Sequence, residues 1–329
     1  MSLISFKKFS YYFFLVIFYY LFLTAIVYSF SFVSLINGKT YDWFWVKSIQ
    51  KQIYFKGYRN IWQNNKNCSI FDKKLLYKPK IGTCEFINPE FKTNLIFSEF
   101  YREHNNSLDS NTSEDYIIVL GDSIAMGWGV NNNETFSFHL EKKLNTKVYN
   151  MAVSSYGSVR EIKKLKLSPF YKNSTNIIIQ YHPNDLEENK ELDINKIYSK
   201  KEFQKKFENN SSNINMYRLI LGTFKSSIRL FFSDINDRIF REKNLELFDF
   251  SIHKKYLEKV LKENIDLNNK RIMIVLPINP WQKVINFPKN TDQIEYILVN
   301  LNESDLFIID DHPNKFGHLK LANILFDYF

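Results

Sequence analysis

An uncharged apolar run near the start of the chain is its most prominent hydropathy feature. It extends from Ser10 to Asn37, and a helix needs about 20 apolar residues to cross a bilayer. The run is longer than the core of a signal peptide, and no clear small-x-small cleavage site follows it. A buried core helix would show polar interruptions, which this run lacks. We therefore predict a transmembrane anchor over 10–37, preceded by an N-terminal tail over 1–9.

The next segment, 38–112, forms a predicted membrane-proximal region that opens with aromatic and basic residues. Tyr and Trp favour the headgroup level of a bilayer, where an apolar ring meets water. The stretch is therefore either an interfacial helix or a segment packed on the main domain, and the pattern leaves both open. Polar residues at Asn105–Ser113 then predict a linker. The aromatic positions are Tyr41, Trp43, Trp45, Tyr54 and Trp62.

From residue 113 to residue 329 the pattern changes to short apolar runs separated by helix-like stretches. Such β-branched runs without alternation are typical of strands buried on both faces, and the intervening segments supply the crossovers that parallel strands require. We therefore predict a doubly wound, flavodoxin-like three-layer α/β/α sandwich with a five-stranded parallel sheet. The predicted strands are Tyr116–Leu120, Lys147–Asn150, Asn176–Tyr181, Arg271–Leu276 and Leu306–Ile309.

The segment between Asn189 and Asn269 is longer than a simple crossover. It contains two probable amphipathic stretches, Met216–Phe240 and Lys254–Asn264. We interpret them as helices that pack on the sheet, with surface decoration around them.

Composition and charge narrow the class of protein. Of the 329 residues, 45% are hydrophobic and 17% aromatic, which is typical of a folded chain with a sizeable core. The net charge of +9 comes from basic residues that are mostly interleaved with acids. Because no helix-turn-helix, zinc-finger or RNP-like motif accompanies them, we expect a solvated surface and no nucleic-acid partner.

Two cysteines, Cys68 and Cys84, lie between the predicted anchor and the predicted sheet. An even number at short spacing favours a disulfide in an oxidising compartment, and two separate buried thiols are the alternative. Lysines flank the apolar run on both sides, so the positive-inside rule does not decide the orientation. The cysteines favour a single-pass inner-membrane protein with its large domain on the extracytoplasmic side.

Candidate chemistry gathers where the predicted strands end, which is where open α/β sheets bind ligands. The first strand runs into GDSIAMGWG, Gly121–Gly129. Gly121 permits a tight turn, Ser123 presents its hydroxyl to the crevice, and the N–H of Ser123 can face a developing oxyanion. A phosphate loop is excluded because neither GxxxxGK[ST] nor a full GxGxxG is present.

The second and third strands add candidate oxyanion donors. Gly157, after the second strand, can bring a backbone N–H close to a substrate, although a plain turn glycine has the same pattern. Asn184, in the segment YHPND, places a neutral side-chain amide at the same edge of the sheet.

The last predicted strand ends in IIDDHPNKFGH. His312 there supplies the base that a serine nucleophile needs, and a neighbouring carboxylate would orient the imidazole. Asp310 shares the strand parity of His312 and is our first choice, with Asp311 as the alternative. The sequence has no HExxH, CxxC or GxSxG motif, so we predict neither a metal nor another cofactor, and no α/β-hydrolase elbow.

Taken in order, these blocks resemble the GDSL/SGNH hydrolase superfamily, and the run GDSIAMGWGV…ETF resembles its membrane-anchored bacterial members. The resemblance implies Ser123 as nucleophile, His312 as base and Asp310 as orienting acid. It also implies an oxyanion hole of the Ser123 N–H, the Gly157 N–H and Asn184. One departure is that many members place the acid three residues before the histidine, where this chain has Ile309.

The function expected from this resemblance is ester hydrolysis through an acyl-enzyme, on a small ester or an acylated glycan. Two alternatives remain open at the level of sequence. The same site would serve an O-acyltransferase that modifies a cell-surface polysaccharide, and a non-catalytic envelope protein could retain the fold alone.

Overall fold

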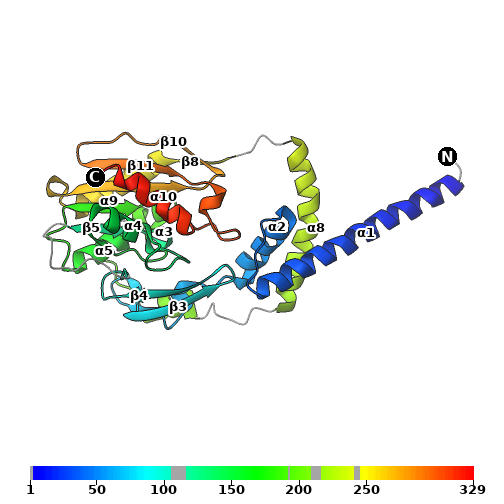
Figure 1. The fold of residues 1–329 in the computed structure, drawn as a ribbon, viewed down its shortest axis with the longest axis horizontal. Coiled ribbons are helices and arrows are strands. Elements are labelled where there is room, and N and C mark those ends of the chain that lie inside the picture. Colours follow the sequence, from blue (N-terminus) through cyan, green and yellow to red (C-terminus); the bar gives the residue numbers. More distant parts are fainter. Residues whose placement is uncertain (1–2, 105–115, 192, 209–215, 241–244) are drawn as a thin grey trace.

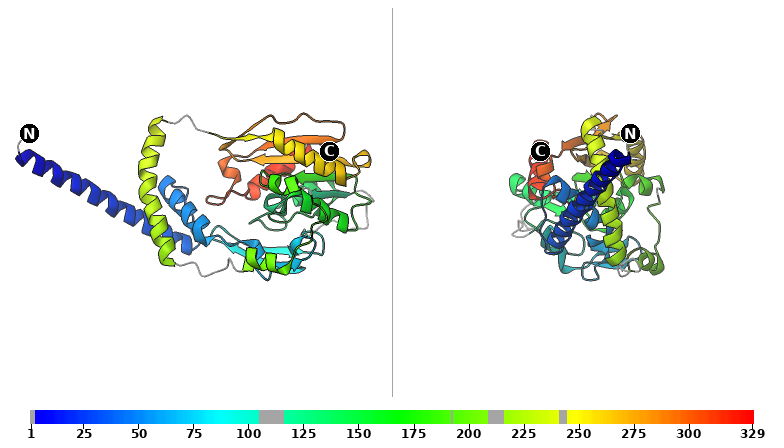
Figure 2. Two further views of the ribbon diagram at one scale, coloured as in Figure 1. Left: turned by 180° about the vertical axis from the view of Figure 1, so that it is seen from behind. Right: turned by 90° about the vertical axis from the view of Figure 1, so that its right-hand side faces the viewer.

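A computed structural model describes residues 3–104, 116–191, 193–208, 216–240 and 245–329 (Figure 1). Helix α1 (Leu3–Ile36) projects away from the rest of the molecule (Figures 1 and 2). Its segment Ser10–Ile36 has a mean hydropathy of 2.2 and is long and apolar enough to cross a membrane. The predicted linker Asn105–Ser113 lies outside the described residues.

A five-stranded parallel sheet forms the centre of the large domain. Its order is β11-β9-β7-β5-β6, and each neighbouring pair is parallel. Numbered along the chain this is the order 2-1-3-4-5 of flavodoxin-like folds, which confirms the predicted fold class. The strands are β5 (Tyr116–Leu120), β6 (Lys147–Asn150), β7 (Asn176–Gln180), β9 (Arg271–Ile278) and β11 (Ile294–Asn300).

The prediction of the fifth strand is wrong. The apolar run Leu306–Ile309 is a loop with one isolated antiparallel bridge, between Leu306 and Pro313, and the edge position belongs to β11. The backbone N–H groups of Ile308 and Ile309 donate to the carboxylate of Glu90 instead of to a neighbouring strand. A distant side chain therefore satisfies the groups that would otherwise need a sheet.

Helices cover both faces of the sheet. Alternate residues of each strand point to opposite faces, so each face contributes to its own core cluster. Ile117 and Val119 of β5 face one core cluster, which includes α4 (Phe136–Leu144) and α10 (Lys315–Phe326). Ile118 and Leu120 face a second cluster, which includes α5 (Ser158–Leu167) and α9 (Phe250–Asn264). The short helices α3 (Ser123–Met126) and α6 (Asp185–Glu191) begin directly behind β5 and β7.

The region before the sheet packs into the same core. Trp62, Tyr77 and Phe86 belong to the cluster that also contains Ile117 and Val119 of β5. Its elements are α2 (Phe44–Ile53), the π-helical turn η1 (Tyr54–Tyr58), the 3₁₀ turn η2 (Trp62–Asn64), β1 (Ser69–Asp72), β2 (Leu76–Pro79), β3 (Gly82–Asn88) and β4 (Phe91–Phe97).

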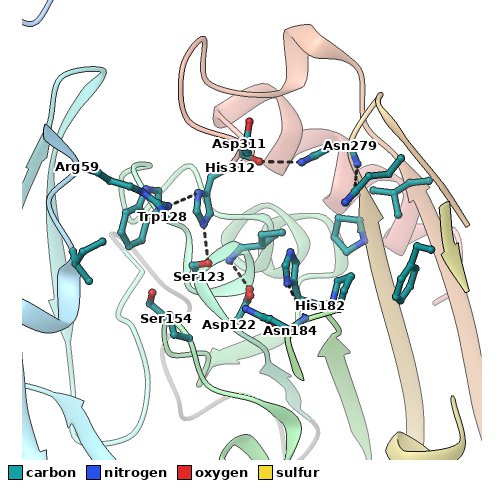
Figure 3. Close-up of a pocket in the computed structure, with 18 of the residues that line it drawn as sticks. Arg59, Asp122, Ser123, Trp128, Ser154, His182, Asn184, Asn279, Asp311 and His312 are labelled. Atoms are coloured by element: carbon teal, nitrogen blue, oxygen red, sulfur yellow. Dashed lines mark hydrogen bonds between the residues drawn. The ribbon is translucent and has the colours of Figure 1, made fainter. Parts of the chain in front are cut away.

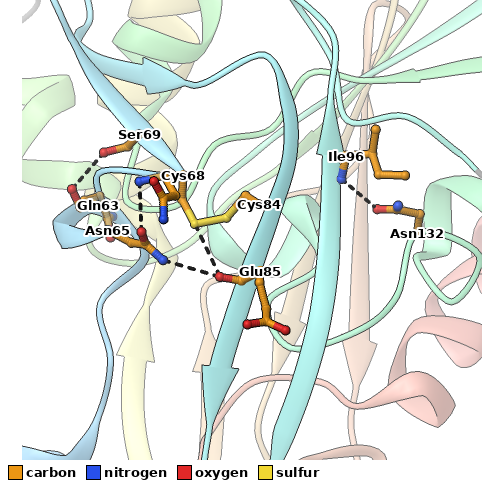
Figure 4. Close-up of a disulfide and its surroundings, with 9 residues drawn as sticks. Gln63, Asn65, Cys68, Ser69, Cys84, Glu85, Ile96 and Asn132 are labelled. Carbon is orange, nitrogen blue, oxygen red and sulfur yellow. Dashed lines mark hydrogen bonds between the residues drawn. A yellow bond between two sulfur atoms is a disulfide. The ribbon is translucent and has the colours of Figure 1, made fainter.

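The expected disulfide is present between Cys68 and Cys84, whose Cα atoms lie 5.0 Å apart (Figure 4). It ties the segment before β1 to strand β3. Asn65 donates from its side chain to the carbonyl of Glu85 beside the bridge, at 3.3 Å.

The long segment between Asn189 and Asn269 contributes helices to two different parts of the molecule. Helix α9 packs on the sheet, as predicted for its part Lys254–Asn264. Helix α8 (Met216–Phe240) is helical as predicted, but it contacts α1, α2 and η1 instead of the sheet, so that part of the prediction is wrong. The remaining elements are α7 (Lys200–Phe203), η3 (Gln204–Glu208), the parallel pair β8 (Glu246–Asp249) and β10 (Gln282–Ile285), η5 (Leu267–Asn269) and η6 (Glu303–Asp305).

Candidate active site

Ser123 opens helix α3 immediately after the turn that follows β5. Gly121 in this turn has φ = +146°, and a Cβ there would lie 2.6 Å from the Cβ of Ala125, so glycine is required. Asp122 caps the helix by accepting a hydrogen bond from the N–H of Ile124 at 2.9 Å. Gln180, at the end of β7, accepts from the N–H of Ala125 at 3.1 Å. These contacts fix the direction of the serine side chain.

His312 reaches this serine from the other end of the chain (Figure 3). Its Nε2 lies 2.7 Å from the Ser123 hydroxyl, and its Nδ1 lies 2.5 Å from Oδ1 of Asp310. With Nδ1 carrying the proton that Asp310 accepts, Nε2 is free to take the proton of the serine hydroxyl. Trp128 stacks on the imidazole with ring centroids 4.9 Å apart, which restricts its tilt.

Asp310 is fully buried, and its second oxygen is surrounded by donors. Tyr54 donates to Oδ2 at 2.5 Å and the Trp128 indole donates at 3.1 Å, while Nε of Arg59 lies 3.4 Å away. Burial raises the pKa of the Asp310 carboxyl, but His312, Arg59 and Tyr54 together hold that pKa below its ordinary value. The carboxylate therefore stays charged and retains its hydrogen bond with Nδ1 of His312.

The alternative acid, Asp311, has a different partner. Its Oδ1 lies 2.5 Å from Nζ of Lys51 in α2, and its side chain is partly exposed. Asp310 thus lies against the imidazole, while Asp311 links the same loop to α2.

Glu90, in the turn between β3 and β4, holds the loop that carries His312. Its carboxylate accepts the backbone N–H groups of Ile308, Ile309 and Asp310 at 2.7, 2.9 and 2.8 Å. Burial raises the pKa of Glu90 to about 7, although these three hydrogen bonds favour the charged form. The sequence analysis missed Glu90, because no local motif distinguishes it from the surrounding hairpin.

The candidate oxyanion donors differ in their position relative to the pocket. Asn184, which follows β7, lines the pocket together with Ser123. Gly157 is not among the residues that line it, and its N–H donates to Glu188 at 3.3 Å. Ser154 and Ser155, from the same loop, line the pocket in its place. The Gly157 N–H would need to leave Glu188 before it could face a substrate oxygen.

The pocket around Ser123 has a volume of about 260 Å³. One wall consists of Arg59, Ile61 and Gln63, which follow η1. The guanidinium of Arg59 lies 4.8 Å from the centre of the Trp128 ring, and its Nη2 lies 3.4 Å from Nδ1 of His312, so Arg59 contacts both rings. Sequence reasoning missed this wall, because the aromatic pattern of 38–112 was compatible with an interfacial helix or with packing on the main domain, and it carried no catalytic motif.

Comparison of structures, and not of sequences, finds known proteins that resemble this chain. No protein-family model matches it, and no curated protein sequence is significantly similar. Its structural neighbours are GDSL/SGNH lipolytic proteins and carbohydrate esterases.

One neighbour is described as a lipolytic protein of the G-D-S-L family from Desulfitobacterium hafniense, with 12% identity and a TM-score of 0.32 over 66% of this chain and 100% of that one. A second G-D-S-L neighbour, from Veillonella parvula, has 14% identity and a TM-score of 0.28 over 65% and 98%. A carbohydrate esterase family 2 enzyme from Corynascus thermopiles has 11% identity and a TM-score of 0.31 over 66% and 65%.

Proposed function

We propose that this protein is a serine ester hydrolase, with Ser123 as nucleophile, His312 as general base and Asp310 as orienting acid. The observation that carries the proposal is the continuous chain of contacts from the Ser123 hydroxyl through both nitrogens of His312 to Asp310. A serine hydroxyl is a weak nucleophile unless such a base adjoins it, and the contacts supply one.

In the proposed first step, the Ser123 oxygen attacks the ester carbonyl carbon while Nε2 of His312 takes the hydroxyl proton. The imidazolium then returns this proton to the leaving alcohol, and an acyl-enzyme remains. Water attacks the acyl carbon with His312 again as base, which releases the acid and restores Ser123. The Ser123 N–H and the Asn184 amide would stabilise the oxyanion, joined by the Gly157 N–H if it leaves Glu188.

The dimensions of the pocket support a small acyl group, since about 260 Å³ leaves little room for a long chain. Asn279 and Gln282 line its outer part with amide groups. Amides of this kind exchange hydrogen bonds with hydroxyls, so we propose an acylated glycan or a similar polyhydroxylated alcohol as the ester partner.

We also propose that α1 is an uncleaved membrane anchor and that residues 38–329 lie on the extracytoplasmic side of an inner membrane. The apolar length of Ser10–Ile36 supports the anchor, and the Cys68–Cys84 disulfide supports an oxidising compartment. Within this scheme 38–112 is the membrane-proximal region and 113–329 is the hydrolase domain.

Covalent labelling with a fluorophosphonate tests the nucleophile directly, because only an activated serine reacts. We expect the full chain to be labelled and the Ser123→Ala variant to lose both labelling and hydrolysis of p-nitrophenyl acetate. Ser251→Ala, at an exposed serine of α9 that does not line the pocket, is the control and should keep both. Labelling that survives in Ser123→Ala would refute the proposal.

A further inference from the structure

The surroundings of α1 change along its length. Its first part exposes most of its apolar side chains, as at Phe22 and Ile26, which are 54% and 50% exposed. Tyr28, Ser31 and Leu35 are instead buried against α2 and α8. Between Ser10 and Ile26 the helix extends about 26 Å, close to the ~30 Å thickness of a bilayer core. One face of the remaining third is covered by protein.

Helix α8 lies across α1 at this transition, with the sheet domain on one side and the projecting part of α1 on the other (Figures 1 and 2). Its contact face carries Leu219, Thr223 and Ser227, which recur every four residues and are buried. The hydroxyl of Tyr28 lies 2.6 Å from that of Thr223, and Tyr20 donates to the carbonyl of Ile228 at 2.9 Å.

The two flanks of α8 beside this contact face differ in character. Ser226 lies on one flank and accepts a hydrogen bond from Lys56 of η1 at 2.7 Å, so this flank faces the sheet domain. Gly222 lies on the same flank, one turn earlier. Tyr217 lies half a turn around the helix from Ser226, with Leu221 beside it, and the two are 71% and 48% exposed. The exposed apolar flank therefore faces away from the sheet domain.

Aromatic residues at the start of α2 lie near this boundary. Trp43 is 66% exposed and stacks on Phe30 of α1 with centroids 6.3 Å apart. An apolar groove of about 540 Å³ between the helices is lined by α1 residues together with Trp45, Ile49 and Ser227. Indole rings favour the headgroup level, and a groove of this kind accommodates an acyl chain.

We propose that α8 lies on the surface of a lipid bilayer, with its Tyr217–Leu221 flank immersed at the boundary between headgroups and acyl chains. In this arrangement α1 enters the bilayer where it crosses α8, between the contacts of Tyr28 and Tyr20. The partner is the bilayer itself, because the exposed apolar flank of α8 continues the exposed apolar surface of α1. The inference rests on the proposed anchor.

Lipid quenching of a fluorophore on adjacent residues tests this arrangement. Leu221→Cys and Gly222→Cys place a nitrobenzoxadiazole label at two positions about 100° apart around α8, on the apolar flank and on the flank of Ser226, and a side chain at Gly222 meets no atom within 4 Å. The full chain is reconstituted in vesicles of phosphatidylcholine and phosphatidylglycerol that carry doxyl groups near the acyl-chain start. Leu23→Cys reports on α1, and Leu167→Cys, exposed at the end of α5, is the distant control.

We expect quenching several-fold stronger at position 221 than at position 222, strong quenching at 23 and none at 167. Equal quenching at 221 and 222 would mean that the apolar flank is not immersed in preference to the flank of Gly222, and would overturn the proposal. Quenching at 23 without quenching at 221 would also overturn it while leaving the anchor intact. No quenching at 23 would remove the anchor on which the inference rests. Fluorophosphonate labelling of each sample reports separately on the hydrolase site.

Discussion

The carboxylate of Asp310 depends on a residue that lies far from it in the sequence. Tyr54 directly follows α2, yet its hydroxyl donates to Oδ2 of Asp310 at 2.5 Å. Burial and the Asp310 charge raise the pKa of Tyr54 well above its ordinary value, so the phenol remains a donor. Tyr54 is therefore a positioning residue, which acts on His312 through Asp310.

Replacing Tyr54 by Phe keeps the ring and removes this one hydrogen bond to a buried charge. Such a bond is worth about 1.5–3 kcal/mol, so we expect kcat for p-nitrophenyl acetate to fall by roughly 10- to 100-fold. KM should change little, because Tyr54 does not line the pocket. Tyr58→Phe is the matched control, since the Tyr58 hydroxyl contacts Met216. An unchanged kcat in Tyr54→Phe would contradict the positioning role.

Glu90→Gln tests the support of the loop that carries His312. The amide has one acceptor oxygen where the carboxylate has two, and its NH₂ group would face backbone N–H groups. We expect the free energy of unfolding to fall by about 2 kcal/mol, together with a loss of kcat. Chemical denaturation in detergent measures the first and steady-state kinetics the second. Glu85→Gln, at an exposed ion pair with Lys92, should leave both unchanged; equal effects in the two variants would argue against a specific role for Glu90.

Among the elements, α10 and α4 are joined by a buried histidine. His318 of α10 accepts a hydrogen bond at Nδ1 from the N–H of Phe136, at 3.2 Å, and is fully buried. Burial lowers the pKa of His318 to about 3. The neutral ring is thus favoured in the folded state, whereas the unfolded chain binds a proton near the ordinary histidine pKa.

This difference predicts acid sensitivity. Between the unfolded and folded pKa values only the unfolded chain is protonated at His318, so stability falls as the pH falls. From about pH 6.5 to about pH 5 the loss attributable to His318 is about 2 kcal/mol. We expect His318→Asn, which keeps an acceptor, to reduce the pH dependence of the unfolding free energy by this amount. Denaturation curves at both pH values measure it, and an identical dependence in both proteins would refute the assignment.

The edge strand β11 shows a limit of sequence analysis that the start of α10 does not. Asn314, directly after the predicted DDHP block, caps α10 by accepting from the N–H of Phe316 at 2.8 Å. Strand β11 was missed, because its pattern includes Glu295 and partly buried positions typical of an edge. The more apolar Leu306–Ile309 looked like the better strand, although Glu90 holds it as a loop.

At the scale of the whole molecule, the disulfide stabilises the region that joins α1 to the sheet. Cys68 and Cys84 close a loop with a sequence separation of 16 residues, and loops of this length are stabilised by about 3 kcal/mol. We expect the double variant Cys68→Ser/Cys84→Ser to lose about that much unfolding free energy, measured in detergent without reductant. Adding reductant should lower the wild-type value towards that of the variant; a wild-type value equal to that of the variant before reduction would contradict the prediction.

Four strands of the sheet and the positions of the motif blocks could be predicted because each depends on a short local pattern. GDS, HPND and DDHPN all lie near one pocket, and His312 lies 2.7 Å from Ser123. The supports of the site could not be predicted. Glu90 and Tyr54 act across 220 and 256 residues of sequence, and such pairings leave no periodic or local signal. The hydrogen bond from the Gly157 N–H to Glu188 could not be predicted either, because these residues are also far apart in the sequence.

The wall of the pocket that begins at Arg59 has a consequence for how the protein can be cut. A protease that cleaved after Ile36 would release a fragment that still holds Tyr54, Arg59 and Glu90. A fragment that lacked residues 38–104 would not contain them, and Asp310 would be without its phenol and guanidinium partners. We expect such a fragment to lack the proposed hydrolase activity, even though every motif residue would remain in it.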